Sequence, residues 1–361
     1  MTPLIIDGHL DLAMNAIEWN RDLTQPLDSI RLREQGWTDK KDRGLGVISL
    51  PEMRQGRIGI CLATMIARYA YDGHPQPGWH SPEIAWAITQ AQRAWYDALE
   101  KQQQVRILKT QRDVAMHAAA WLQNPDDQSG NLPIGLILTL EGADSLFNFE
   151  CLEHAFEYGL RAIGPAHYGP GVYAPGTGCD GGLTARGREL LIEMENLKMA
   201  LDVTHLTDQG FWESLDLFSG PVWASHSNCR WLVPDQRQLN QDQIRALAER
   251  DAVIGTALVA WMLVPNWQRG TTQPQDVGVS LQHAADQIDG ICQLLGNVRH
   301  VAIGSDLDGG FGKEQAPVDL ESIADLQKLE AIFCERGYSQ SDREAIFCQN
   351  WLRHFGESLP P

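Results

Sequence analysis

The chain has 361 residues, 43% of them hydrophobic, and carries a formal net charge of −18. This composition is that of a globular protein with a sizeable core, long enough for two ordinary domains or one α/β barrel with insertions. Because strong negative charge repels phosphate backbones and anionic lipid surfaces, we expect neither nucleic acid nor a membrane as partner. The sequence lacks both a signal-peptide pattern and an apolar run of about 18 residues. We therefore expect a cytoplasmic protein.

Short apolar runs with strand character recur along the chain. They cover residues 3–6, 58–65, 133–140, 160–164, 199–203, 221–224, 252–258 and 300–304. Helical patterns separate them, at 82–103, 184–197, 241–250 and 281–295, after His205, and from about 320 to 355 near the C-terminus. The helix at 82–103 has Ser81 as its expected N-cap and Pro82 at its first position.

Strands that alternate with helices imply a parallel sheet, and eight repeats favour closure into a barrel. The alternative is an open doubly wound sheet, but its Gly-x-Gly-x-x-Gly fingerprint between strand and helix is missing. We predict a distorted (β/α)8 TIM-type barrel in a single domain, residues 1–361. The polar segment at about 14–56 is an insertion, expected to fold over the site or against a neighbouring subunit.

Most of the predicted strands end in side chains that bind metals or transfer protons. These are His9 and Asp11, Glu141, His167, His205, His226 and Asp306. In a barrel the carboxyl ends of all strands open on one face, so we expect these groups to converge. The set is too rich for one tetrahedral zinc and suits two cations bridged by a carboxylate and a water. A water shared by two cations loses a proton near neutral pH, which indicates metal-assisted hydrolysis of an amide or ester.

Motifs along nearly the whole chain are similar to those of the membrane (renal) dipeptidase family of zinc peptidases, within the amidohydrolase superfamily. They are Asp7-Gly8-His9-Leu10-Asp11, Glu141-Gly142, Gly182-Leu183-Thr184, Gly187-Arg188-Glu189-Leu190, Asp202-Val203-Thr204-His205, Ser225-His226-Ser227, Gly304-Ser305-Asp306-Leu307-Asp308-Gly309, Arg336-Gly337-Tyr338-Ser339 and Asn350-Trp351-Leu352-Arg353. They occur in the order in which the family has them.

The resemblance implies a site for two Zn²⁺ ions per chain. By motif position, His9 and Asp11 would bind one zinc, His205 and His226 the other, and Glu141 would bridge them. It also implies a small dipeptide as substrate and a homodimer as the assembled state.

The resemblance further implies roles for groups that contact the substrate. His167 matches a family histidine that contacts the substrate and can stabilise the oxyanion, and Asp306 matches the acid–base carboxylate. Arg237 matches the arginine that binds the C-terminal carboxylate of the substrate, with Arg230 as the alternative. A guanidinium fork that meets a carboxylate fixes orientation as well as charge.

This sequence departs from the family pattern at several places beside the expected site. Leu10 replaces an Asn, Ala143-Asp144 follows Gly142 where the family often has His, and Ala257-Leu258 replaces an Asn-Phe pair. Three hypotheses follow. The first is a zinc dipeptidase that cleaves L-Xaa-L-Xaa or L-Xaa-D-Xaa by a metal-bridging hydroxide. The second is a binuclear amidohydrolase acting on another small amide, such as an N-acyl amino acid, and the third is a metal-binding protein without turnover.

Overall fold

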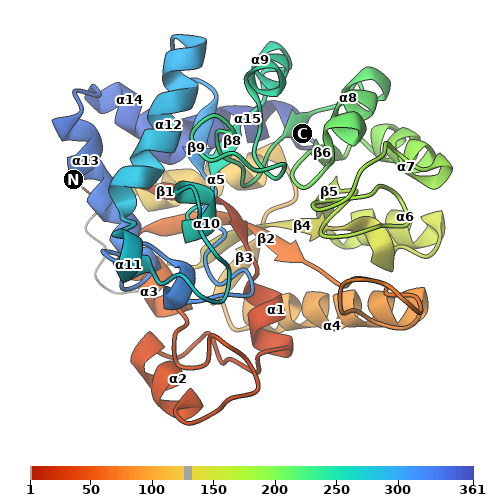
Figure 1. Cartoon of the computed structure of the whole chain (residues 1–361), viewed down its shortest axis with the longest axis horizontal. Helices are drawn as coiled ribbons and strands as arrows, with labels where there is room; N and C mark the ends of the chain where they lie inside the picture. Colours follow the sequence, from red (N-terminus) through yellow and green to blue (C-terminus); the bar gives the residue numbers. More distant parts are fainter. Residues whose placement is uncertain (1, 126–131) are drawn as a thin grey trace.

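The computed structural model describes residues 2–125 and 132–361, and its centre is a barrel of parallel strands surrounded by helices (Figure 1). The strands are β1 (Ile5–Leu10), β2 (Ile58–Met65), β3 (Val105–Ile107), β4 (Ile134–Glu141), β5 (Leu160–Gly164), β6 (Ala200–Asp202), β7 (Val222–Trp223), β8 (Ile254–Thr256) and β9 (Val301–Ile303). Eight of these strands lie at the predicted positions.

The barrel is closed. Its strands pair in the order β7-β6-β5-β4-β2-β1-β9-β8, and the pairs are parallel. The ends of this order meet through a bridge between Ala224, directly after β7, and Ile254 of β8. The Gly255 N–H donates to the Ala224 carbonyl oxygen at 2.8 Å. The predicted barrel is therefore confirmed, and the alternative of an open doubly wound sheet is excluded.

Strand β3 was not predicted. It pairs with the first residues of β4 and lies off the strand order that forms the barrel. Its central residue, Arg106, is exposed, and the polar run Gln102-Gln103-Gln104 precedes it. No apolar run marks such a strand, because its place depends on pairing with β4 rather than on its own sequence.

Helices surround the barrel and occupy the connections between its strands. They are α1 (Leu12–Ile17), α2 (Leu27–Glu34), α3 (Leu50–Gln55), α4 (Pro82–Lys101), α5 (Gln111–Gln123), α6 (Phe149–Tyr158), α7 (Ala185–Asn196), α8 (Asp208–Leu217), α9 (Gln241–Glu249), α10 (Ala260–Leu263), α11 (Pro274–Val277), α12 (Leu281–Leu295), α13 (Leu329–Glu335), α14 (Gln340–Glu344) and α15 (Asn350–Ser358). The Ser81 hydroxyl accepts from the Ile84 N–H at 3.1 Å, so α4 begins with the predicted cap. None of the described helices has the length and apolar character needed to cross a bilayer.

The C-terminal helical region is interrupted. A 3-10 turn at Ile323–Lys328 precedes α13, and a π turn at Ala345–Gln349 joins α14 to α15. Gly337, with φ +86°, follows α13, and Ser339 caps α14. A left-handed glycine ends a helix because a side chain would be strained there.

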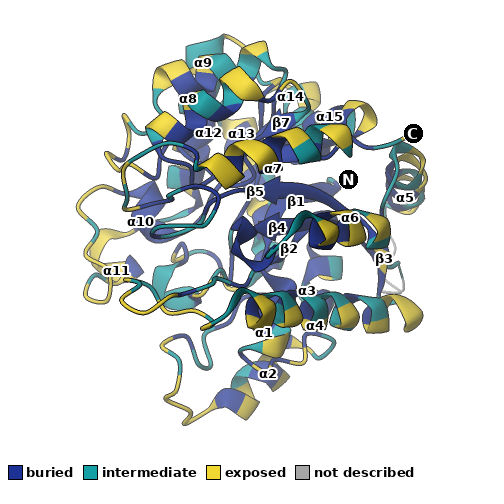
Figure 2. Ribbon diagram, turned by 90° about the vertical axis from the view of Figure 1, so that its right-hand side faces the viewer, coloured by how far each residue is buried: buried dark blue, intermediate teal, exposed yellow. Residues whose placement is uncertain are grey.

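The strands are buried on both faces, as expected for a parallel barrel enclosed by helices (Figure 2). Trp351 of α15 packs inside the amino-terminal end of the barrel, where its indole N–H donates to the Ile303 carbonyl oxygen at 3.0 Å. Its ring lies 6.0 Å from that of Trp223 on β7. A Cβ on Gly8 would come within 2.6 Å of the Trp351 ring, so the packing requires glycine there.

The insertion at 14–56 is held against the carboxyl-terminal end of the barrel by buried charges. We call this set the Arg21 network: Arg21, Glu34, Asp42, Arg43 and Asp308. Arg21 pairs with Glu34 at 2.9 Å and with Asp42 at 3.0 Å. Asp308, which follows β9, accepts the Val47 N–H at 2.9 Å and the Ile48 N–H at 3.0 Å. The insertion therefore folds over the barrel end, which is one of its two predicted positions.

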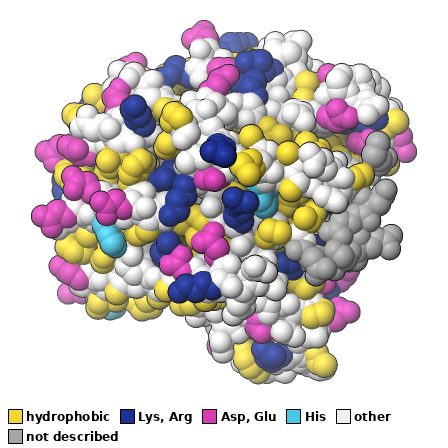
Figure 3. Space-filling view, turned by 180° about the vertical axis from the view of Figure 1, so that it is seen from behind, with side chains coloured by type: hydrophobic (Ala, Val, Ile, Leu, Met, Phe, Trp, Pro, Cys, Tyr) yellow, Lys and Arg dark blue, Asp and Glu magenta, His cyan; other side chains and the backbone are white. Residues whose placement is uncertain are grey.

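Acidic and basic side chains are interspersed over the surface seen in Figure 3, and acidic ones gather along its left edge. The charged side chains on this face thus lie in solvent and are of both signs.

Candidate metal centre and active site

The predicted site residues lie together at the carboxyl ends of the barrel strands. They are His9 in β1, Asp11 directly after it, Glu141 at the end of β4, His167 after β5, His205 after β6, His226 after β7 and Asp306 after β9. These residues make up three overlapping groups, within each of which the ligand atoms lie within 4.8 Å of one another. The predicted convergence is therefore present.

Glu141 lies at the centre of the cluster. Its Oε1 is 3.2 Å from His205 Nε2 and 3.4 Å from His226 Nε2. Its Oε2 faces the other side and is 3.7 Å from His9 Nε2, which in turn is 3.7 Å from an Asp11 oxygen. One carboxylate thus points one oxygen at each of two ligand pairs, which is the arrangement that a bridging ligand needs.

The chemistry of this donor set fits metal ions. His9 Nε2, Asp11 Oδ1 and Glu141 Oε1 are buried, and the described residues offer them no hydrogen-bond partner. Leaving a buried polar atom unpaired costs about 1–3 kcal/mol, and more for a charged group. Imidazole nitrogens and carboxylate oxygens around shared points suit divalent transition metals such as zinc.

Hydroxyl groups hold the imidazole rings so that Nε2 faces the cluster. Thr64 Oγ1 lies 3.2 Å from His9 Nδ1, and Thr177 Oγ1 lies 2.9 Å from His205 Nδ1. Ser225 Oγ lies 2.8 Å from Nδ1 of His226. Such partners orient ligating rings. The two threonines were not predicted, because neither stands in one of the motifs.

Two buried aspartates fix the backbone that carries the ligands. Asp7 Oδ1 accepts the His9 N–H at 3.1 Å and the Ser305 N–H at 2.8 Å, which ties the end of β1 to the end of β9. Asp202 Oδ1 accepts the Thr204 N–H at 3.0 Å and the Ser225 N–H at 3.1 Å. Each stands within three positions of a predicted ligand, so the repeated aspartate before a histidine was a signal in the sequence for this role.

Burial and mutual charge shift the pKa values in the cluster. Burial raises the pKa of Glu141 to about 8, although the charge of His9 opposes the shift. Burial alone would lower the pKa of His9, but the Glu141 and Asp11 carboxylates raise it to about 10. Burial and the charge of Arg237 hold the pKa of His205 well below its usual range. The protein groups around Glu141 therefore compensate the negative charge of its ionised form poorly.

Arg68, which was not predicted, contacts His167. Its Nη2 lies 2.6 Å from His167 Nδ1. An arginine donates only, so Nδ1 accepts and the ring proton of neutral His167 is on Nε2. That nitrogen lies 3.8 Å from Glu141 Oε2. Burial lowers the pKa of His167 well below its usual range, which favours this neutral form. His167 therefore presents an N–H to the site.

Asp306 lies between the cluster and solvent. Its carboxylate is 4.0 Å from His9 Nε2, and its side chain is 16% exposed. The backbone is in the left-handed region there, with φ +56°, and His205 shares this conformation with φ +69°. Such strain in residues other than glycine is common at functional sites.

Of the two candidate arginines, Arg237 is the one that reaches the cluster. Its Nη2 donates to the His226 carbonyl oxygen at 2.7 Å and its Nη1 to Ser227 Oγ at 3.1 Å. Its buried Nε lacks a partner among the described residues. Arg230 instead forms a two-pronged ion pair with Asp208, at 2.7 Å for each nitrogen. This geometry favours Arg237 as the carboxylate-binding group.

A cavity of about 400 Å³ opens directly onto the cluster. Asp11 and His167 of the cluster line it, together with Arg68, Trp19 and Trp79. The insertion supplies Trp19, which agrees with its predicted position over the site.

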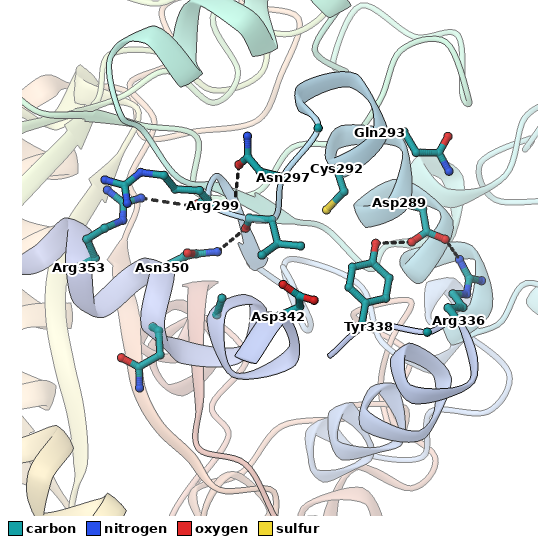
Figure 4. Close-up of a pocket in the computed structure, with 15 residues that line it drawn as sticks. Asp289, Cys292, Gln293, Asn297, Arg299, Arg336, Tyr338, Asp342, Asn350 and Arg353 are labelled. Carbon is teal, nitrogen blue, oxygen red and sulfur yellow. Dashed lines mark hydrogen bonds and ion pairs between the residues drawn. The ribbon is translucent and has the colours of Figure 1, made fainter. Parts of the chain in front are cut away.

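A larger cavity, of about 1060 Å³, lies elsewhere (Figure 4). The turn before β9 and helices α12 and α14 line it, so it borders the amino-terminal start of β9 rather than its carboxyl end. Its arginines are paired: Arg336 with Asp289, and Arg299 and Arg353 with Asp251. We therefore place the chemistry at the smaller cavity.

A closed (β/α)8 barrel with converging histidines and carboxylates at its carboxyl ends defines the class: a metal-dependent hydrolase. Residues 2–358 match the model of the membrane dipeptidase family, peptidase family M19. The chain belongs to this family and is a metallo-dipeptidase by membership, as the motifs predicted.

Relatives cover much of the chain. It is 31% identical over 230 residues to an uncharacterized protein in the pqqA 5′ region of Klebsiella pneumoniae, covering 61% of this chain and 80% of that protein. It is 25% identical to the dipeptidase aclJ of Aspergillus oryzae, covering 98% and 78%.

Solved structures share the fold. The M19 metallopeptidase described as dipeptidase AC has a TM-score of 0.79 at 23% identity and covers 100% of both chains. A metallopeptidase from Rhodobacter sphaeroides, solved with a phosphinate mimic of L-Ala-D-Ala, has a TM-score of 0.78 at 23% identity, covering 99% of this chain and 100% of that one.

Proposed function

We propose that the protein is a zinc-dependent dipeptidase with two Zn²⁺ ions per chain. His9 and Asp11 would bind one ion, His205 and His226 the other, and Glu141 both. The observation that carries the proposal is the position of Glu141, whose two oxygens face these two pairs. When bound, two such ions polarise a carbonyl oxygen and lower the pKa of water.

The remaining groups supply binding and proton transfer. Arg237 holds the α-carboxylate of the C-terminal residue, which fixes the peptide across the cluster. His167 donates its Nε2–H to the carbonyl oxygen of the scissile bond as negative charge develops there. Asp306 accepts a proton from the attacking water and passes it to the amine that leaves.

The proposed substrates are dipeptides, L-Xaa-L-Xaa or L-Xaa-D-Xaa. The dipeptide mimic in the relative from Rhodobacter sphaeroides supports this class. The second candidate, hydrolysis of an N-acyl amino acid, rests on the departures beside the site. One of these has a structural role, since Asp144 Oδ1 accepts the Val172 N–H at 2.9 Å and holds the loop at 168–182.

Metal removal and reconstitution test the proposal. We expect metal-stripped protein to be inactive and to recover hydrolysis of L-Ala-L-Ala or L-Ala-D-Ala as two zinc ions per chain bind. The Glu141→Gln variant should lose at least about 10³-fold in kcat/KM, because the Lewis-acid contribution is worth several kcal/mol. Cleavage of N-acetyl-alanine but of no dipeptide would favour the second candidate. Full activity of Glu141→Gln would overturn the bridging role.

A cytoplasmic location, a homodimer and a single domain over residues 1–361 stay predictions. Sedimentation of the purified protein measures the assembled state.

A further inference from the structure

A second cavity of about 400 Å³ adjoins the metal cluster on the side of the loop that follows β8. Tyr168 separates this cavity from the cluster. Its ring centroid lies 5.0 Å from that of His167 and 5.1 Å from that of His205. Trp261 and Phe311 contribute further aromatic walls. A side chain in this cavity would therefore lie one aromatic ring away from the proposed zinc ligands.

Cationic side chains line this cavity. The Arg269 guanidinium lies 3.9 Å from the centroid of the Trp261 ring, and its Nη2 donates to the Tyr168 hydroxyl at 3.2 Å. The Lys41 Nζ is 4.0 Å from the position that a Cβ on Gly270 would take, which places it beside Arg269. Arg68 completes this group at the wall shared with the first cavity.

Within the described ranges, Arg269, Lys41 and Arg68 form no direct ion pair with a carboxylate, although Asp144 and Glu141 attract Arg68 at longer range. Arg269 instead donates to Tyr168 and lies over Trp261, and Arg68 contacts His167. Glu314 is the acidic residue on the lining, and both its oxygens accept from the Gly312 N–H, at 3.2 and 3.0 Å. In a chain of net charge −18, a cavity with this excess of positive groups is complementary to an anion.

The Arg269 side chain is also preorganised to bind an anion. Stacking on an indole ring and a hydrogen bond to a phenol restrict its side chain, so less entropy is lost when it forms hydrogen bonds to a carboxylate. The remaining guanidinium nitrogens can donate two parallel hydrogen bonds to a carboxylate.

The neighbouring Arg237 indicates which part of a dipeptide reaches this cavity. Arg237 donates to the His226 carbonyl oxygen at 2.7 Å, and the Tyr168 ring lies 5.1 Å from that of His205, so Arg237 and Tyr168 flank the same pair of histidines. The side chain of a C-terminal residue leaves the same Cα as the α-carboxylate that Arg237 would hold. A cavity beyond Tyr168 is therefore placed to receive it.

We propose that this cavity binds an acidic side chain on the C-terminal residue, so that the preferred substrates are dipeptides that end in Asp or Glu. The proposal rests on the dipeptidase function proposed above. It adds a second carboxylate site, formed by Arg269 with Lys41, to the one at Arg237.

Paired substrates that differ only in charge test it. The zinc-loaded enzyme is assayed with L-Ala-L-Glu against L-Ala-L-Gln, with the corresponding D-Glu and D-Gln pair, and with L-Glu-L-Ala against L-Gln-L-Ala. We expect kcat/KM to be about 10- to 100-fold higher for Glu than for Gln at the C-terminal position, as for a charge-assisted hydrogen bond. The pair that varies the N-terminal residue should differ little.

In the Arg269→Gln variant, kcat/KM for the substrate ending in Glu should fall to within a few-fold of kcat/KM for the one ending in Gln, mainly because KM for the acidic substrate rises. Lys41→Gln should reduce this ratio less. Arg112→Gln is the matched control, since Arg112 is an exposed arginine on α5 at the opposite end of the barrel. It should preserve the wild-type ratio.

The outcomes separate this proposal from the dipeptidase function itself. Hydrolysis of L-Ala-L-Gln and L-Ala-L-Glu at equal rates would overturn the acidic subsite while leaving the dipeptidase intact. So would a preference confined to the N-terminal position, or a ratio that Arg269→Gln does not change. Failure to cleave any of the six dipeptides would instead contradict the proposed function.

Discussion

Two buried groups of charged residues lie side by side at the carboxyl-terminal end of the barrel. They differ in how far other protein groups compensate the charges of their carboxylates. In the Arg21 network, Glu34 meets Arg21 at 2.9 Å and Arg43 at 2.6 Å, and the Asp308 carboxylate accepts backbone N–H groups. In the metal cluster, Asp11 and Glu141 each leave an oxygen without a partner in the described chain.

The difference teaches how to recognise a site among buried acids. A carboxylate whose charge is met by guanidinium or N–H groups is complete within the protein and acts structurally. A carboxylate that faces only imidazole nitrogens and other carboxylates requires positive charge from a ligand. Asp308 is a carboxylate of the first kind and Asp306 is one of the second kind. Because they are only two positions apart in the sequence, they allow a direct test.

Replacing these two aspartates should give opposite results. Asp306→Asn should lower kcat by about 10²- to 10⁴-fold, the contribution of a positioned general acid–base group, while KM and zinc content stay near wild type. Asp308→Asn keeps an oxygen for the Val47 and Ile48 N–H groups, so it should lower thermal stability and leave kcat within a few-fold. Steady-state kinetics, metal analysis and a melting curve measure both. A larger loss of kcat in Asp308→Asn would contradict the division.

Removing the cation of the Arg21 network should damage the fold. Arg21→Met leaves Glu34 and Asp42 buried with less compensation, which should lower the free energy of unfolding by about 3–5 kcal/mol. Arg245→Met is a suitable control, because Arg245 pairs with Asp242 at 3.0 Å and both side chains are exposed, and such a pair contributes about 0–1 kcal/mol. Denaturant unfolding of the metal-free proteins measures both values.

The metal cluster should behave in the opposite way in the same experiment. Burial raises the pKa of Glu141 to about 8, so without metal this carboxyl is largely neutral near pH 7. Glu141→Gln replaces it with another neutral group of the same shape, so metal-free Glu141→Gln should be as stable as metal-free wild type, or more so. A loss similar to that of Arg21→Met would show that the chain itself compensates Glu141, and would remove the distinction between the two regions.

The position of Arg68 extends the comparison to His167, the imidazole proposed to stabilise the oxyanion. Arg68→Met should lower kcat by about 10- to 100-fold, because the charged hydrogen bond that fixes the His167 ring is lost. KM should change less, since Arg68 acts through His167 in this role. A fall in kcat/KM carried by KM alone would assign Arg68 to substrate binding instead.

Much of the fold and most of the site could be predicted from the sequence. The barrel strands are continuous apolar runs, and residues such as His9 and Glu141 stand at their ends, so strand direction alone brings them together. What could not be predicted depends on contacts between distant segments. Arg68 and His167 are 99 positions apart, and neither Thr64 nor Thr177 stands in a motif.

The sequence also does not show which buried carboxylates are compensated within the protein and which belong to the site. The segment at 14–56 reads as polar and mixed, and nothing in its order shows that Glu34 and Asp42 converge on Arg21. Pairing of that kind is a property of the folded chain, whereas a run that ends in His-x-Asp is visible locally.

A third buried group is His354, at the amino-terminal end of the barrel, which forms no ion pair with the described residues and lies among aromatic rings. His354 packs 5.6 Å from the Trp223 ring and 6.5 Å from the Trp351 ring, and burial lowers its pKa to about 4. In the unfolded chain its pKa is about 6.5, so between these values the unfolded state binds more protons and stability falls as pH falls. From pH 7 to pH 5 this loss amounts to about 2 kcal/mol. Unfolding of wild type and His354→Phe at both pH values measures it, because the variant should lack this part of the pH dependence; equal slopes would show that His354 already carries its proton in the folded barrel.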